Sequence, residues 1–154
     1  MDSDVTQAEL FTQKLVDQMH RYFDSQALKS LRIGIREIIV NAIEHGNLEI
    51  SFEEKSKILE TSDYMEFLLE RQKHELYSAR KVVIDYSISS KSLTLRITDE
   101  GPGFDHAAFS KRADLDPEMM MLEHGRGIII TKSIFDVVQF NEKGNQIYLV
   151  KRLA

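Results

Sequence analysis

The 154-residue sequence contains no cysteine, no excess of basic residues and no long apolar run. The absence of cysteine excludes disulfide bonds, thiolate metal sites and cysteine nucleophiles. With 20 basic and 25 acidic side chains the formal net charge is -5, so no overall positive field attracts nucleic acid or an anionic membrane. No apolar stretch approaches the roughly 20 residues of a membrane span, and the acidic start is unlike a secretory signal. We therefore expect a cytoplasmic protein that binds neither nucleic acid nor membranes.

Zinc-binding patterns, internal repeats and low-complexity segments are also missing. No second histidine or suitably spaced carboxylate accompanies His45, as a zinc site would require. The proportions of apolar residues, 42%, and charged residues, 29%, are those of an ordinary globular protein. Together with the length, they predict that residues 1–154 form one domain with a hydrophobic core.

Apolar spacing predicts two helices near the start of the chain. Residues 6–22 carry apolar side chains at helical spacing, and Asp24-Ser25 can cap a second helix that Gly46 stops. Glu37 and Asn41 lie one turn apart beside the buried stripe of the second helix. That stripe is predicted to contain Leu28, Leu31, Ile35, Ile38, Ile39, Ala42 and Ile43.

Composition and alternation predict the other elements. Residues 51–79 are charged and helix-prone, which indicates a helical excursion with capping boxes at 51–54 and 63–66. Residues 104–124 are polar and predict a mobile loop with short helical pieces. The remaining segments predict strands at 81–89, 92–98, 135–141 and 146–152, and a helix at 125–134.

The first of three chemistry-bearing blocks is the pair Glu37 and Asn41. Both lie in a strongly apolar helix, where an unpaired carboxylate is costly unless it faces a cleft, a metal or a partner. The carboxylate could polarise an attacking hydroxyl, and the amide oxygen could ligate Mg²⁺. The same pair also fits a solvated helix edge.

The second block, Asp99-Glu100-Gly101-Pro102-Gly103, follows a predicted strand. Asp99 could accept a hydrogen bond from an exocyclic amine such as that of adenine. Gly101 and Gly103 allow the backbone to approach a ligand, although the block also has the composition of a tight turn.

The third block, Gly125-Arg126-Gly127, opens a predicted helix. Free amides and the helix dipole attract phosphate there, and the Arg126 side chain could add a charge-assisted contact. A helix start without a ligand explains this block equally well.

In this order, the blocks resemble the N, G1 and G2 boxes of the GHKL (HATPase_c) ATPase superfamily. The resemblance covers roughly residues 25 to 153 and is nearest to stand-alone anti-sigma-factor serine/threonine kinases of the RsbW and SpoIIAB type. The matching residues are Glu37, Asn41 and His45-Gly46-Asn47 for the N box, Asp99 to Asp105 for G1, and Gly125-Arg126-Gly127 with Ile134-Phe135-Asp136 for G2 and the following strand.

The resemblance implies a Bergerat fold, an α+β two-layer sandwich with helices on one face of a mixed, mostly antiparallel sheet. ATP would lie between the layers, under a lid at 104–124. The implied roles are general base for Glu37, Mg²⁺ ligand for Asn41, adenine contact for Asp99, nucleotide-facing turn for Gly101 and Gly103, and phosphate-binding turn for Gly125, Arg126 and Gly127.

The resemblance also implies partners. In the serine-kinase branch, the γ-phosphate passes to a Ser or Thr of a STAS-domain anti-anti-sigma protein, the kinase sequesters a sigma factor, and homodimers are common. Two alternatives remain open: a non-catalytic GHKL module that binds nucleotide or a partner, and a detached histidine-kinase-like ATPase domain. The retained Glu37 favours the kinase.

Overall fold

A four-stranded sheet frames the structure, a computed structural model that describes residues 1–61, 63–104 and 126–153. The strands are β1 (Val83–Ile88), β2 (Ser92–Thr98), β3 (Val137–Phe140) and β4 (Gln146–Arg152), in the order β1-β2-β4-β3. Each of these neighbouring pairs is antiparallel. Thr98 of β2 pairs with Gln146 of β4, so the end of β2 lies beside the start of β4.

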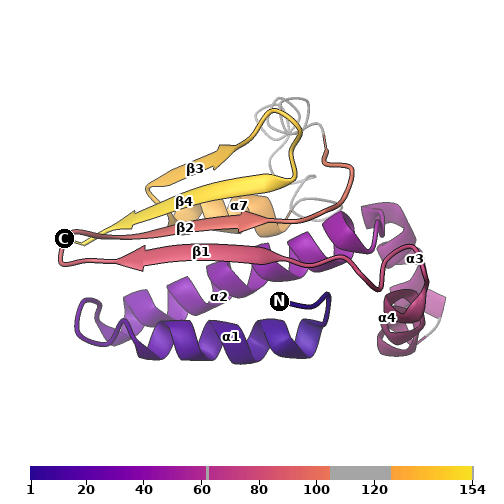
Figure 1. Ribbon diagram of the computed structural model, residues 1–154. Helices are drawn as coiled ribbons and strands as arrows, with labels where there is room; N and C mark the ends of the chain where they lie inside the picture. The colour runs from indigo at the N-terminus through magenta and orange to yellow at the C-terminus, as the bar shows by residue number, and fades with distance from the viewer. Residues whose placement is uncertain (62, 105–125, 154) are drawn as a thin grey trace.

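The hydrophobic core lies between one face of the sheet and the helices that cover it. Alternation along the strands points one set of apolar side chains to this face, and all of them are buried: Leu93, Leu95, Ile97, Ile147 and Leu149. Helices α2 (Ser25–Asn41) and α7 (Arg126–Ile134) cover the face, and α1 (Val5–Asp17) packs beside α2 (Figure 1). This arrangement confirms the predicted α+β fold with helices on one side of the sheet.

Aspartate caps begin the two long helices. The Asp4 carboxylate accepts a hydrogen bond from the Thr6 amide at 2.9 Å, and the Asp24 carboxylate accepts one from the Ala27 amide at 2.8 Å. The helix predicted for residues 6–22 is shorter, because α1 ends at Asp17 and turns follow. The apolar stripe of α2 is buried as predicted, with Leu28, Leu31, Ile35, Ile38 and Ile39 in the core.

The end of α2 differs from the prediction. The chain continues as a π-helical turn, η1 (Ala42–Asn47), in which the Leu48 amide donates to the Ile43 carbonyl at 2.8 Å. Gly46 lies inside this turn and does not stop the helix. The wider turn accommodates an extra residue, so side chains after Asn41 leave the positions that α-helical spacing predicts.

Helices α3 (Phe52–Thr61) and α4 (Tyr64–Lys73) form the predicted excursion at one end of the molecule (Figure 1). Both begin with the predicted caps. The Ser51 hydroxyl accepts from the Glu54 amide at 3.0 Å, and the Asp63 carboxylate accepts from the Met65 amide at 3.0 Å. These caps fix where each helix starts.

Helix α7 packs closely against α2 at Gly34. A Cβ on Gly34 would lie 3.1 Å from side-chain carbons of both Ile134 and Phe135, which is tighter than ordinary van der Waals contact. The start of α7 also lies next to α2, because a Cβ on Gly127 would meet Asn41 and Glu37.

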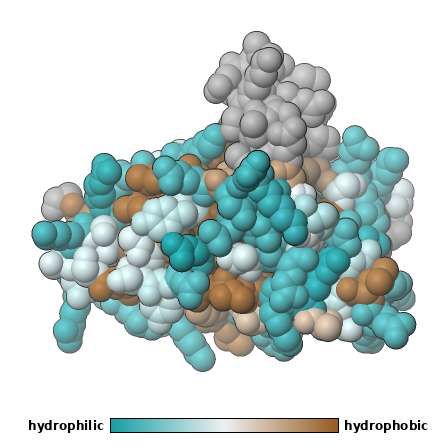
Figure 2. All heavy atoms as spheres, turned by 45° about the horizontal axis from the view of Figure 1, so that its top comes forward, coloured by the Kyte–Doolittle hydropathy of each residue, from teal (hydrophilic) through white to brown (hydrophobic). Residues whose placement is uncertain are grey.

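The face of the molecule in Figure 2 is mostly hydrophilic, and its apolar side chains gather in small, separate patches. Among the helices of the described residues, none is long and apolar enough to cross a membrane.

Candidate functional site

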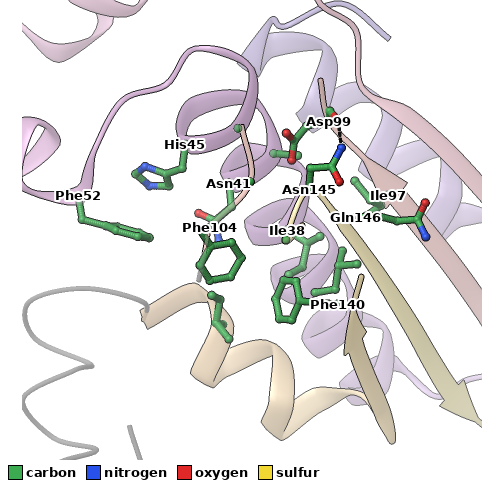
Figure 3. Close-up of a pocket in the computed structure, with 16 residues that line it drawn as sticks. Ile38, Asn41, His45, Phe52, Ile97, Asp99, Phe104, Phe140, Asn145 and Gln146 are labelled. Atoms are coloured by element: carbon green, nitrogen blue, oxygen red, sulfur yellow. Dashed lines mark hydrogen bonds between the residues drawn. The ribbon is translucent and has the colours of Figure 1, made fainter. Parts of the chain in front are cut away.

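A cavity of about 100 Å³ opens where α2 and η1 meet the ends of β2 and β4 (Figure 3). An apolar cavity of about 150 Å³ can hold benzene, so this cavity has about two-thirds of the volume that encloses such a ring. A few polar groups, among them Asn41 and Asp99, interrupt a wall that is otherwise largely apolar. The apolar part contains Ile38, Phe52, Ile97, Phe104, Ile128, Phe140 and Ile147.

Asp99 places a carboxylate in the cavity wall, directly after β2. Its Oδ1 accepts a 2.8 Å hydrogen bond from the Gly101 amide, and no other described residue donates to its side chain. A Cβ on Gly46 would lie 2.6 Å from either carboxylate oxygen, so η1 can pass this close only with glycine. Burial raises the pKa of Asp99 to about 6, although the Gly101 amide, Lys143 and Arg80 lower it. At neutral pH the carboxylate is therefore an ionised hydrogen-bond acceptor at an apolar cavity.

Two asparagines hold the turn that carries Asp99. Asn145 donates from Nδ2 to the Asp99 carbonyl at 2.9 Å (Figure 3), and the Asp99 amide donates to the Asn145 carbonyl at 2.9 Å. Asn47 is fully buried; its Oδ1 accepts from the Glu100 amide at 2.6 Å and its Nδ2 donates to the Ser3 hydroxyl at 3.0 Å. The turn is thus fixed from η1, from the first residues of the chain and from the β3–β4 hairpin.

The chain beyond this turn crosses the β3–β4 hairpin backbone against backbone. Gly103 and Gly144 have φ angles of 81° and 84°, in the left-handed region that favours glycine. A Cβ on Gly103 would overlap the Lys143 carbonyl oxygen, and a Cβ on Gly144 would overlap the Phe104 carbonyl oxygen. Glycine is required at both positions for the two segments to pass.

The second polar region of the site forms where α2 meets the start of α7. A Cβ on Gly127 would lie 2.8 Å from Asn41 Nδ2 and 2.9 Å from Glu37 Oε2. Both polar side chains of α2 therefore reach the backbone of Gly127, one residue after α7 begins. Asn41 also lines the cavity that contains Asp99. The first and third sequence blocks thus meet, and Asn41 connects them with the second.

A comparison with known protein families agrees with this geometry. The histidine kinase-like ATPase domain, HATPase_c_2, matches residues 2–151. The chain belongs to the histidine kinase-like ATPase domain family. No curated protein matches the sequence significantly. Family membership extends the assignment over almost the whole chain and supports ATP binding by this domain.

The site of this histidine kinase-like ATPase domain has chemically suitable groups for each part of ATP. Asp99 offers an acceptor to the amine of adenine, and the apolar wall suits the base. The start of α7 has free amides and the positive end of a helix dipole, groups that can bind phosphate. Within the described ranges, no three His, Asp or Glu side chains cluster to hold a metal ion. Asn41 would hold Mg²⁺ together with phosphate oxygens, the usual arrangement for this ion.

The structure brings most predicted site residues together. Glu37, Asn41 and Gly127 are adjacent, and Gly101 contacts the backbone of η1. Arg126 is the first residue of α7. Gly125 and the predicted lid from residue 105 onward lie outside the described residues.

Three site residues were not found from the sequence. Asn47 has a place in the N-box match but no role that its position predicts, and nothing near Asn145 in the sequence indicates a contact with Asp99. Asn145 lies opposite Asp99, one step beyond the Thr98–Gln146 pair of the antiparallel ladder. The two residues meet only because β2 pairs with β4, which is distant in sequence. Phe52 was visible only as an apolar residue inside a capping box.

Proposed function

We propose that this histidine kinase-like ATPase domain is a protein serine/threonine kinase of the anti-sigma-factor type, which transfers the γ-phosphate of ATP to a STAS-domain protein. The contact of Glu37 and Asn41 with Gly127, at the start of α7, carries this proposal. A carboxylate beside a phosphate-binding helix end repels phosphate, so a site that only held nucleotide would gain nothing from it. A catalytic role for Glu37 explains why it is there.

Each residue then has a defined task. Asp99 accepts a hydrogen bond from the adenine amine, and the amides at the start of α7 bind phosphate oxygens. Glu37 accepts the proton of the Ser or Thr hydroxyl while the hydroxyl oxygen forms a bond to the γ-phosphorus. The bond between the γ-phosphorus and the oxygen that joins it to the β-phosphate breaks, and ADP leaves. Asn41 would hold Mg²⁺, which supplies neutralisation of phosphate charge when bound.

The partners in the proposal come from the resemblance of the three blocks to anti-sigma-factor kinases. The acceptor is a STAS-domain anti-anti-sigma protein, and the kinase sequesters a sigma factor in the cytoplasm. The kinase acts as a homodimer, which light scattering coupled to size-exclusion chromatography would detect.

Glu37→Gln tests the kinase against a non-catalytic binding module. We expect transfer of ³²P from labelled ATP to STAS-domain proteins of the same organism to fall at least about 100-fold, because a general base contributes about that much. The calorimetric Kd for MgATP should stay within about threefold. Glu60→Gln, the same substitution at an exposed position of α3, is the control and should change neither value.

Two other results would count against the kinase. Saturable MgATP binding without transfer to any STAS protein would favour the binding module. If the protein is folded but binds no ATP, the proposed nucleotide site is wrong as well.

A further inference from the structure

The helical excursion contributes a side chain to the nucleotide cavity. Phe52, the first residue of α3, lines the same cavity as Asp99 and Asn41. Its ring lies against the His45 ring of η1, with 4.0 Å between centroids and 36° between planes. Figure 3 shows Phe52 extending from α3 toward the cavity, on the side away from Asp99. One wall of the cavity is thus a pair of tilted rings from two different elements.

Several contacts between the excursion and the segment of η1 and the two residues after it fix the position of Phe52. Lys55 of α3 donates to the Glu44 carboxylate at 2.6 Å, and Glu44 is only 3% exposed. From α4, Arg71 donates to the carbonyls of Leu48 at 2.9 Å and Glu49 at 3.2 Å. Helices α3 and α4 are therefore held against the turn that carries His45.

This arrangement suits a flat heterocycle. Asp99 offers its carboxylate to one edge of a base, and the His45 and Phe52 rings offer an aromatic surface to the rest. Bases stack on aromatic side chains with little dependence on sequence, because every base has a π face. A ring supplied by α3 would add to the affinity set by the hydrogen bond at Asp99.

We propose that Phe52 contacts the base of the bound nucleotide, so that α3 is part of the nucleotide site. The inference rests on the proposed ATP site and adds an affinity determinant that lies outside the three sequence blocks. It makes the excursion a wall of the site rather than a separate attachment.

Truncating the ring tests the inference. In the full chain, Phe52→Ala should weaken MgATP binding about tenfold by calorimetry, the scale of one base–aromatic contact. Adenosine, measured by competition, should lose the same factor, because the contact is with the base. Phe52→Leu, which keeps an apolar side chain without the ring, should bind MgATP more weakly than the wild-type protein. Leu59→Ala, at a position of α3 that is 58% exposed, is the control and should bind as wild type does.

The outcomes separate this inference from the proposed function. A wild-type protein that is folded but binds no ATP would overturn both. Wild-type binding with Phe52→Ala and Phe52→Leu within twofold would overturn only the role of Phe52. A loss for MgATP without a loss for adenosine would place the effect at the phosphates and also overturn it. Thermal unfolding of each variant shows whether it is folded.

Discussion

Asp99→Asn should make the protein more stable at neutral pH while it weakens nucleotide binding. Burial raises the pKa of Asp99 from 3.8 to about 6, so the folded protein holds an ionised carboxylate in an unfavourable place at pH 7.5. The difference corresponds to about 3 kcal/mol, and solvent access to this half-buried group reduces it to about 1–2 kcal/mol. Asn has nearly the same shape and carries no charge.

The effect of Asp99→Asn on stability should depend on pH. A raised pKa in the folded state means that the contribution of Asp99 to stability is fully present below pH 3.8 and is lost as pH rises through about 6. The advantage of Asp99→Asn should therefore be full at pH 7.5 and about a third as large at pH 4.5.

Thermal unfolding across this pH range measures the effect. At pH 7.5 the melting temperature should rise by about 2–8 °C for a domain of this size. Asp85→Asn, the same substitution at an exposed position of β1, is the control. A melting temperature that is unchanged or lower at pH 7.5, or a gain that is equal at both pH values, would refute the reasoning.

Binding should change in the opposite direction. In Asp99→Asn the amide oxygen can keep the hydrogen bond from the Gly101 amide, which leaves the NH₂ group for the ligand. A donor would then face the adenine amine, also a donor. We expect a calorimetric Kd for ATP about 10- to 100-fold weaker, the loss typical of a hydrogen bond to a charged group.

Two further substitutions test the site and its support. Gly127→Ala should weaken MgATP binding at least about tenfold by calorimetry, because the new methyl group would push the side chains of Glu37 and Asn41 away from α7. The free energy of unfolding should change by no more than about 1 kcal/mol, since alanine favours helices. Lys55→Met leaves the buried Glu44 carboxylate unpaired and should lower the free energy of unfolding in urea by about 3 kcal/mol. The double variant with Glu44→Gln should recover most of that loss, and equal stability of Lys55→Met and wild type would contradict the role of the ion pair.

Local patterns predicted most elements of the fold. The stripe from Leu28 to Ile39 has a helical period, and β2 and β4 alternate, so these segments record their own buried faces. The helix caps at Asp24 and Asp63 are equally local. Such features depend on residues a few positions apart, which a sequence displays directly.

The π turn and the support of Asp99 depend on packing that spacing does not record. Residues 42–47 have the composition of an α-helix end, and only the tertiary structure shows the wider turn that places Gly46 against Asp99. The pairing of β2 with β4 brings Asn145 to Asp99 across 46 positions of sequence. Motif blocks named Asp99 and the polar residues of α2, whereas Asn47 and Asn145, which hold the Asp99 turn, came only from the fold.

The hydrogen bonds around Asp99 also determine when during folding the site can form. The bond from Glu100 to Asn47 spans 53 positions and that from Asn145 to Asp99 spans 46, so both close long loops. A partly folded chain that lacks either the η1 turn or the β3–β4 hairpin has no fixed carboxylate to offer. We therefore expect nucleotide to bind the fully folded domain and not its folding intermediates. Nucleotide binding would then stabilise the native state.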